Sequence, residues 1–491
     1  MRCASVCELF RRYLTPSRAG SRSRWRSCLL VTGVIIVVQI ATPASANDLM
    51  RLYQLALTRD STLRAAKYQR DAAIEARPQA LSQWLPQLSG SGGRERHFIS
   101  EPAASFGLTD NGSTPPPLGY FGLADCSHTS ANTVHCTANT TTYGLTLTQT
   151  LWSYQAYSQL KEADAEAAIA EASYVSTQQD LVLRVAQAYF RVLGAQDQLT
   201  ALRLEREAYA MQLKEARDRE RTGLGSRSDV EQVQSYYDLT AQSLINAQNA
   251  LDDDSLALAT LVGEPPGHLA PLIDQIPLAA PDPASADNWV TSALRDNPDV
   301  RAAELAVEAA ARDISVQRGR GLPTISLSGT DQRAVGPPVL GGDSTIGTVG
   351  VYLNWPLFQG GAIASAVRQS RALYHQTEAN LETSRRDTAQ QTRAAYRNIV
   401  AGIASINAAR RAEDSAYTAV QAARHDIEFN VSPEFILLSY QARYYSAVNA
   451  YDQARYAYLT NVLVLKQQAG RLTERDLAAI DALLVAPGSS K

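Results

Sequence analysis

The sequence predicts a mainly α-helical protein with a small transmembrane β part, in which one helix–strand–strand–helix unit occurs twice. Three observations lead to this fold class: parts of the chain match each other at fixed offsets, long stretches contain no proline, and a few short segments alternate apolar with polar residues. Hydrophobic residues make up 45% of the 491 positions and charged residues 19%, which is typical of a folded chain and excludes disorder throughout.

The first 46 residues predict a secretory signal peptide that is cleaved before Asn47. Seven arginines against one glutamate give this segment a charge of +6, and the 13-residue apolar run Cys28–Ile40 is followed by Ala44-Ser45-Ala46. A membrane anchor is the alternative, but a bilayer span needs about 20 apolar residues. Since the whole chain carries −3, the remaining 445 residues carry −9, which excludes a broad electrostatic surface for nucleic acid.

Internal repetition organises the rest of the chain. Leu85–Gly92 matches Leu322–Gly329 at an offset of 237, and Gly144–Trp152 matches Gly350–Phe358 at an offset of 206. The first unit is therefore 31 residues longer between these two blocks. The resulting segments are a first repeat at 47–275, a linker at 276–284, a second repeat at 285–472 and a C-terminal tail at 473–491.

Proline placement predicts very long helices. Positions 118–264 and 357–432 contain no proline, and an interior proline would cost a helix about 3 kcal/mol. We therefore expect long helices over about residues 153–262 and 360–469. Within the first, apolar residues step by four and three alternately, as in a coiled-coil seam. The seam residues are Leu181, Val185, Ala188, Val192, Ala195, Leu199 and Leu202.

Four short strands are expected, with a surface loop at about 99–141 between the first two. The strands are placed at about 86–98, 142–152, 323–333 and 346–357. Apolar and polar residues alternate over about ten positions with aromatic residues near the ends, a pattern typical of a membrane barrel wall. An ordinary half-buried soluble sheet gives the same alternation. Since a membrane barrel needs at least about eight strands, several chains would have to share one barrel.

Two cysteines remain once the signal segment and its three cysteines are removed. Cys126 and Cys136 lie in the expected surface loop, and in an oxidising compartment they most simply form a disulfide. His128 and His135 lie between them, so a four-ligand metal site is an alternative, although the spacing matches no established zinc motif. Two free thiols are the other alternative. We predict the disulfide and no bound metal.

Several motifs resemble the TolC family of outer-membrane channel proteins, and the likeness covers nearly all of the mature chain. The most specific are Asn297–Ala303, Trp355–Gly361, Thr222–Val230 and Ala469–Leu477. The resemblance implies a homotrimer whose pooled strands form a 12-stranded barrel in the outer membrane, above an α-helical tunnel in the periplasm. As partners it implies outer-membrane lipid, a periplasmic adaptor (membrane fusion) protein and an inner-membrane ABC or RND transporter, and no nucleic acid.

The resemblance also places contacts with the adaptor at two helix-to-helix turns, one in each repeat. In the first turn, glycines permit the positive φ that such a turn requires. The implied contact residues are Gly223, Leu224 and Ser226 in the first turn, and Asn430, Val431 and Ser432 in the second.

A periplasmic gate is the last feature that the resemblance implies. Asp229 matches a position that helps to hold the entrance closed, although capping of the following helix by Ser228 or Asp229 is an equally good explanation. Ser432 stands where family members can carry a gating arginine, so the usual ion-pair lock is in doubt. We expect Asp229 to rely on Arg227, Arg221 or backbone amides, and Glu434 to be a substitute acid near the entrance.

The sequence predicts neither an enzyme nor a cofactor. Its six histidines are scattered, and it contains no zinc-protease motif, no nucleophile elbow and no glycine-rich phosphate loop. We therefore expect a passive exit duct of a tripartite export system, which serves type I protein secretion, multidrug efflux or both. The alternative is a trimeric periplasmic or surface coiled-coil scaffold without transport activity.

Overall fold

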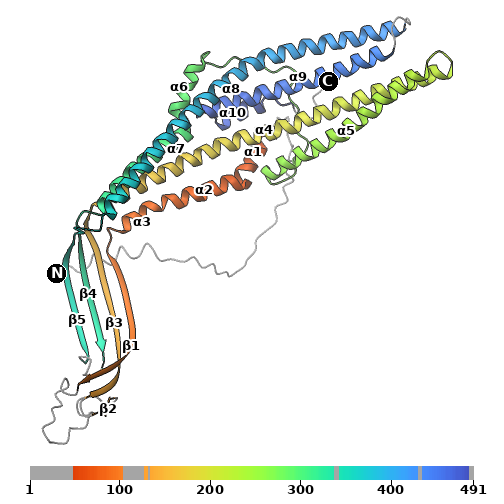
Figure 1. Ribbon diagram of the computed structural model, residues 1–491. Helices are drawn as coiled ribbons and strands as arrows, with labels where there is room; N and C mark the ends of the chain where they lie inside the picture. The colour runs from red at the N-terminus through yellow and green to blue at the C-terminus, as the bar shows by residue number, and fades with distance from the viewer. Residues whose placement is uncertain (1–47, 103–125, 131–132, 337–341, 429–433, 486–491) are drawn as a thin grey trace, which may run out of the picture. The chain divides into compact units, whose positions relative to one another are not determined.

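The computed structural model describes residues 48–102, 126–130, 133–336, 342–428 and 434–485. The predicted signal peptide, residues 1–46, lies outside this part of the chain. Each half contains short helices, then strands, then a long helical hairpin (Figure 1). The first half consists of α1 (Asp48–Arg59), α2 (Ser61–Ile74), α3 (Ala76–Ser82), β1 (Gln87–Pro102), β2 (Cys126–Ser130), β3 (Thr133–Ser153), α4 (Tyr154–Arg221) and α5 (Arg227–Val262). The second consists of α6 (Ala286–Asp296), α7 (Pro298–Gly319), β4 (Thr324–Val335), β5 (Ser344–Asn354), α8 (Ala362–Glu428) and α9 (Glu434–Gln468), and α10 (Glu474–Asp481) follows.

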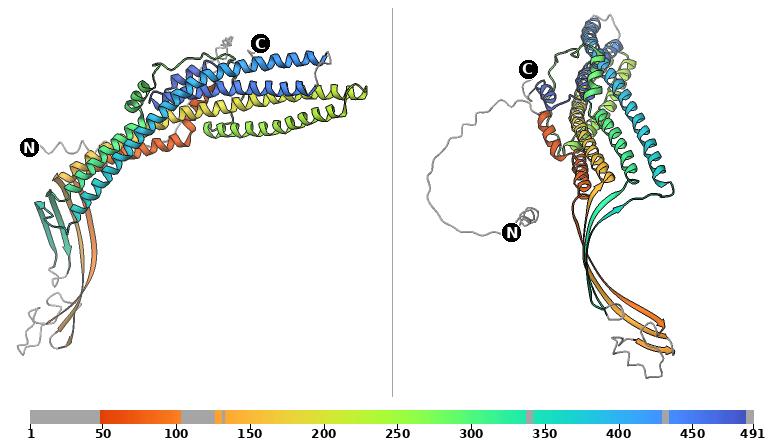
Figure 2. Two further views of the ribbon diagram at one scale, coloured as in Figure 1. Left: turned by 45° about the horizontal axis from the view of Figure 1, so that its top comes forward. Right: turned by 90° about the vertical axis from the view of Figure 1, so that its left-hand side faces the viewer.

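The long helices form two antiparallel hairpins, in which α5 folds back along α4 and α9 folds back along α8 (Figures 1 and 2). At 1.5 Å per residue, the 68 residues of α4 extend about 100 Å. The predicted seam is buried at every position from Leu181 to Leu199, which confirms it as packing surface. The helix begins at Ser153, whose side-chain oxygen accepts a hydrogen bond from the Ala156 N–H (3.1 Å).

The strands form one antiparallel sheet in the order β1-β3-β4-β5, and β2 pairs with the outer part of β3. The repeats meet in this sheet, because β3 of the first half pairs with β4 of the second. The register aligns Leu88 with Leu147, Leu147 with Gly329, and Gly329 with Val349. The predicted fold class, mainly helical with four long strands from a duplicated unit, is confirmed.

The predicted bounds of the first strand pair were wrong. β1 continues to Pro102 and β3 already begins at Thr133, so part of the expected loop at 99–141 is strand. The threonine-rich segment before Tyr143 favours extended structure, and β1 supplies hydrogen-bond partners along it. In the second pair, β5 ends at Asn354 rather than 357, because Pro356 has no N–H to donate.

The C-terminal segment after α9 belongs to the core. Leu477 of α10 is fully buried in the main apolar cluster, which also contains Leu49 and Tyr189. The Asp481 carboxylate accepts a hydrogen bond from the Leu49 N–H (3.0 Å), and Leu484 forms a β-bridge with Leu272. These contacts join the two ends of the described chain.

None of the helices in the described part of the chain combines the length and the hydrophobicity needed to cross a bilayer.

Candidate functional site

The turn between α4 and α5 is closed by backbone hydrogen bonds around a left-handed glycine. The Leu224 N–H donates to the Arg219 carbonyl (2.9 Å), and the Gly223 N–H donates to the Glu220 carbonyl (3.0 Å). This pattern is a Schellman motif. Gly223 has a φ of +75°, where any side chain would be strained, so the glycine fixes the end of α4.

Leu224 is presented at this turn with 83% of its surface exposed. In a Schellman motif the residue at this position often packs back on the helix, and here it does not. The turn approaches the helix closely: a Cβ on Gly225 would lie 2.9 Å from the Cβ of Arg219. A leucine on a turn with so little freedom offers a defined apolar contact to a partner protein.

Ser226 and Asp229 form a capping box at the start of α5. The Asp229 N–H donates to the Ser226 Oγ (3.1 Å), and the Ser226 N–H donates to the Asp229 carboxylate (3.2 Å). Each side chain thereby satisfies a backbone N–H that the helix leaves free. The Asp229 carboxylate therefore serves as part of a helix cap within a single chain.

The two arginines expected to support Asp229 have other partners. Arg227 lies 3.7 Å from Glu231 in an exposed pair, and Arg221 pairs with Asp218. Of the three expected sources of support, a backbone amide is the one that contacts Asp229 in the described chain.

The second helical turn lies outside the described residues. This applies to Asn430, Val431 and Ser432, and Glu434 is placed only as the first residue of α9.

A buried contact joins the first hairpin to α9 and was not anticipated from the sequence. Tyr209 and Leu213 of α4, Val233 of α5 and Leu438 of α9 form one apolar cluster, in which Tyr209 and Leu438 are fully buried. Burial raises the pKa of Tyr209 far above its ordinary value, as does the adjacent Glu205 carboxylate, so the hydroxyl stays neutral. The spacing of apolar residues in the sequence predicts that these four side chains are buried. It does not predict which helix they pack against.

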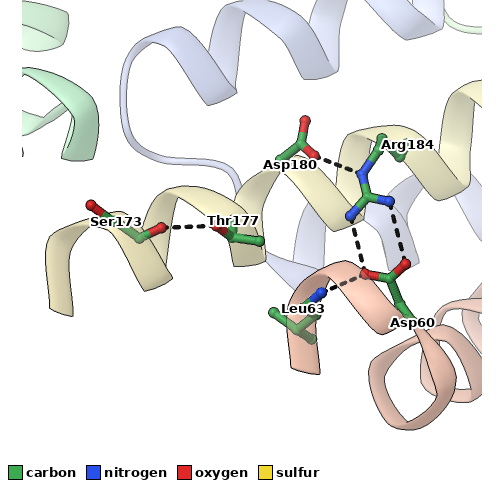
Figure 3. Close-up of polar contacts among 6 residues, drawn as sticks. All are labelled: Asp60, Leu63, Ser173, Thr177, Asp180 and Arg184. Carbon is green, nitrogen blue, oxygen red and sulfur yellow. Dashed lines mark hydrogen bonds and ion pairs between the residues drawn. The ribbon is translucent and has the colours of Figure 1, made fainter. Parts of the chain in front are cut away.

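A second polar site missed by the sequence reasoning lies where α2 begins (Figure 3). The Asp60 carboxylate accepts a hydrogen bond from the Leu63 N–H (2.7 Å) and is 6% exposed. Arg184 of α4 donates to both Asp60 oxygens, at 3.4 and 3.2 Å, and to Asp180 at 2.6 Å. Figure 3 shows the guanidinium between the two carboxylates. Capping and charge pairing thus hold α2 on α4, and an aspartate directly before the helical segment was the sequence signal for the cap.

The sheet has two chemically different faces. One face, here called the apolar face, carries exposed aliphatic side chains on three of the four long strands, β1, β3 and β5: Leu88, Leu145, Leu147, Val349, Val351 and Leu353. Several of them line a common shallow groove. The opposite face, here called the polar face, carries serine and threonine, among them Ser89, Thr146 and Ser328. An exposed aliphatic sheet face is expected where lipid, not water, is the solvent.

The two cysteines lie opposite each other in the strand register, with Cys126 of β2 paired with Cys136 of β3. Their side chains lie outside what the structure describes, so the predicted disulfide stays a prediction. Within the described residues, no cluster of His, Cys, Asp or Glu is arranged to hold a metal ion.

Comparison with known proteins places this geometry in a family. The family described as "Outer membrane efflux protein" matches residues 52–264 and 289–471, which cover both repeats. Outer membrane protein TolC of Vibrio cholerae is 27% identical over 442 residues, covering 89% of this chain and 94% of that protein. The alkaline protease secretion protein AprF of Pseudomonas aeruginosa is 29% identical over 450 residues, covering 90% of this chain and 88% of that protein.

The fold is also found among solved structures. The CmeC outer membrane channel of Campylobacter jejuni superposes with a TM-score of 0.71 at 15% identity, and the match covers 96% of this chain and 99% of that chain. At this identity the likeness concerns the fold alone.

Proposed function

The chain belongs to the outer membrane efflux protein family, and from this premise we propose that it is the outer-membrane exit duct of a tripartite export system. It acts as a passive conduit for a secreted protein, for small toxic compounds or for both. The pump is an inner-membrane ABC or RND transporter, which a periplasmic adaptor protein links to the duct. The segment 1–46 directs the chain to export, and no cofactor takes part.

The observation that carries this proposal is the sheet with one apolar face and two unpaired edges. In the described chain β1 pairs only with β3, and β5 pairs only with β4, so each has an edge of free backbone groups. A bilayer offers no water to satisfy such groups. Three copies that pair β1 of one protomer with β5 of the next close a 12-stranded barrel, with the apolar face toward lipid and the polar face toward the lumen.

The helical turns are the docking sites for the adaptor. In the first turn Leu224 is the anchor, and Gly223 and Ser226 set its position through the Schellman motif and the helix cap. The second turn contributes Asn430, Val431 and Ser432. An exposed leucine at the end of a helical hairpin can fill an apolar groove on a partner, as the apolar residues of a docked helix do.

The gate relies on apolar contact more than on charge. The Asp229 carboxylate is occupied in the helix cap, and Arg227 pairs with Glu231, so neither is free for a strong ion-pair lock. Glu434 is the first acid after the second turn in the sequence and is the substitute acid near the entrance. The cluster of Tyr209, Leu213, Val233 and Leu438 holds α9 against the first hairpin and is the apolar contact that we assign to the gate.

A disulfide between Cys126 and Cys136 braces the extracellular end of the sheet. Residues directly opposite in an antiparallel pair have Cα atoms about 4.5–5.5 Å apart, within the range a disulfide needs. Alkylation without prior reduction should leave both cysteines unmodified.

Planar-bilayer reconstitution of the purified full-length protein tests the proposal. A duct gives discrete conductance steps, and crosslinking in native membranes gives a trimer. A coiled-coil scaffold gives no steps, and a dominant monomer would contradict the shared barrel. Identification of the co-purifying inner-membrane transporter then separates protein secretion from drug efflux.

A further inference from the structure

The apolar face is bounded along the strands by aromatic side chains. Trp152 stands in register with Ile325 and Leu353 at one end, and Tyr143 stands in register with Arg333 at the other. Strands rise about 3.3 Å per residue and tilt by about 40° in such barrels, so the two aromatic residues are separated by roughly 20 Å along the membrane normal. This matches the apolar band of about 25 Å between aromatic girdles.

Three arginines lie on the apolar face at the level of Tyr143 and beyond it, on the side away from Trp152. Arg333 pairs across the strands with Tyr143, Arg94 pairs with Thr141 in the next row of this face, and Arg96 lies one row farther out. Side chains two residues apart on a strand share a face, so all three continue the apolar face beyond its aliphatic part.

The three arginines are exposed and lack a carboxylate partner among the described residues. Arg94, Arg96 and Arg333 form no ion pair within the described chain, and Arg96 is stacked over Phe98, with its guanidinium carbon 5.5 Å from the ring centre. Among the strand residues of this face Asp331 is the acidic one, one row closer to the aliphatic part, so the strand residues of the patch carry a charge of +2 per protomer.

The polar face carries no such arginine cluster on the strand residues at the level of Arg94 and Arg96. Glu95 lies between the two arginines of β1 and therefore points to the polar face, where it lies 3.5 Å from His97. Positive charge is thus confined to the side of the sheet that carries the aliphatic residues.

We propose that Arg94, Arg96 and Arg333 form a binding surface for the phosphorylated headgroups of outer-leaflet lipid. The inference rests on the proposed function, because only an outer-membrane barrel places this face against lipid. Acyl chains cover the apolar face up to Tyr143, and the phosphates of the same molecules lie at the arginines just beyond it. A guanidinium binds phosphate through two parallel hydrogen bonds, and the adjacent apolar wall selects a lipid phosphate over a free one.

A titration of the purified full-length protein with bisphosphorylated lipid A, followed by native mass spectrometry, tests this assignment. The triple variant Arg94→Gln/Arg96→Gln/Arg333→Gln should bind about 100-fold more weakly, since each arginine near a charged lipid surface contributes a factor of about five. Dephosphorylated lipid A should bind the native protein with an affinity close to that of the triple variant. Inorganic phosphate at millimolar concentration should not compete.

The matched control removes three exposed arginines from α8, in the variant Arg371→Gln/Arg397→Gln/Arg411→Gln, and should bind lipid A as the native protein does. Equal binding of phosphorylated and dephosphorylated lipid by the native protein overturns the assignment, as does competition by inorganic phosphate. This comparison needs no variant, so it holds even if the triple variant fails to assemble. Channel conductance in the same preparation separates the two proposals: conducting protein with unchanged lipid binding refutes only the lipid surface.

Discussion

Asp60 and Asn297 occupy the same position in the two repeats, 237 residues apart, and both are buried caps at the start of a helix. Asp60 is 6% exposed and caps α2, whereas Asn297 is 4% exposed and caps α7. Asp60 accepts one backbone N–H bond and is neutralised by Arg184. Asn297 accepts bonds from the Asp299 and Val300 N–H groups and donates its own N–H to the Gln468 carbonyl (2.9 Å).

The comparison shows that the free N–H groups at the start of a buried helix can be capped either by a carboxylate or by an amide. A carboxylate can only accept hydrogen bonds, so a buried one needs a cation. An amide carries its own donor, so a carbonyl is sufficient as its partner. The second repeat also has no arginine at the positions that match Arg184: the residues that follow Arg184 by 206 and 207 positions are Gln390 and Gln391.

The largest effect is expected from Arg184→Met, which leaves the buried Asp60 carboxylate without its cation. The free energy of unfolding should fall by about 3 kcal/mol, as for other broken buried pairs, measured by denaturant unfolding followed by circular dichroism. Arg191→Met, an exposed change on the same helix, is the control and should stay within about 0.5 kcal/mol of the native protein. The double variant Asp60→Asn/Arg184→Gln copies the second repeat and should regain most of the loss. A double variant no more stable than Arg184→Met would contradict the comparison.

Asn297→Asp should cost about 2 kcal/mol near neutral pH, since it directs a carboxylate at the Gln468 carbonyl, and the neighbouring Arg295 and Arg471 already pair with Asp296. Protonation gives the carboxyl a donor again, so the loss should disappear as the pH falls below about 4. Asn297→Ala is the control and should lose about 1 kcal/mol at every pH, because it removes the cap itself. Denaturant unfolding at a series of pH values measures both variants. A loss that does not depend on pH would show that the introduced carboxylate finds another partner.

Glu162 of α4 tests whether a partly buried carboxylate needs a cation, because no ion pair of Glu162 is found among the described residues. Burial, followed by the charges of Asp313 and Glu166, raises its pKa from 4.5 to about 7. The unfolded carboxyl loses its proton near pH 4.5 while the folded one keeps it, so folding stability falls between pH 4.5 and about 7. Glu162→Gln should therefore stabilise the protein near pH 8 by about 1 kcal/mol, a value reduced for partial solvent exposure, and change little near pH 4.

The melting temperatures of the native protein and of Glu162→Gln, measured across this pH range, check the prediction. A gain that persists at pH 4 would mean that the glutamine acts through packing and not through the proton.

The smallest effect is expected at the helical turn, where the cap is exposed. Asp229→Ala should lower stability by no more than about 1 kcal/mol and raise the resting conductance in planar bilayers only modestly. Ser226→Ala removes the other half of the same capping box and is the matched control. Full opening by Asp229→Ala alone would reveal a strong lock, and equal behaviour of the two variants would reduce Asp229 to a helix cap.

Much of the helical turn was predictable from the sequence, because its interactions are local. The glycine at 223 specified the end of α4, and it is present. The cap of α5 was expected at Ser228 or Asp229, whereas the structure has Ser226 as the N-cap and Asp229 as the other half of the capping box. Asp229 has fewer hydrogen-bond and ion-pair partners than expected. Arg221 pairs with Asp218 and Arg227 with Glu231, each three or four residues away on the same helix.

The sequence by itself determined the duplicated plan, the long helices, the buried seam and the alternation that gives the sheet two faces. These features depend on periodicity and on hydrogen bonds between near neighbours, which short stretches of residues encode completely. Only the tertiary structure decided that Arg184 neutralises Asp60, that Leu438 packs on Tyr209 and that α10 completes the core. Such contacts join residues more than a hundred positions apart, and their energy depends on a geometry that exists only once the elements have packed together.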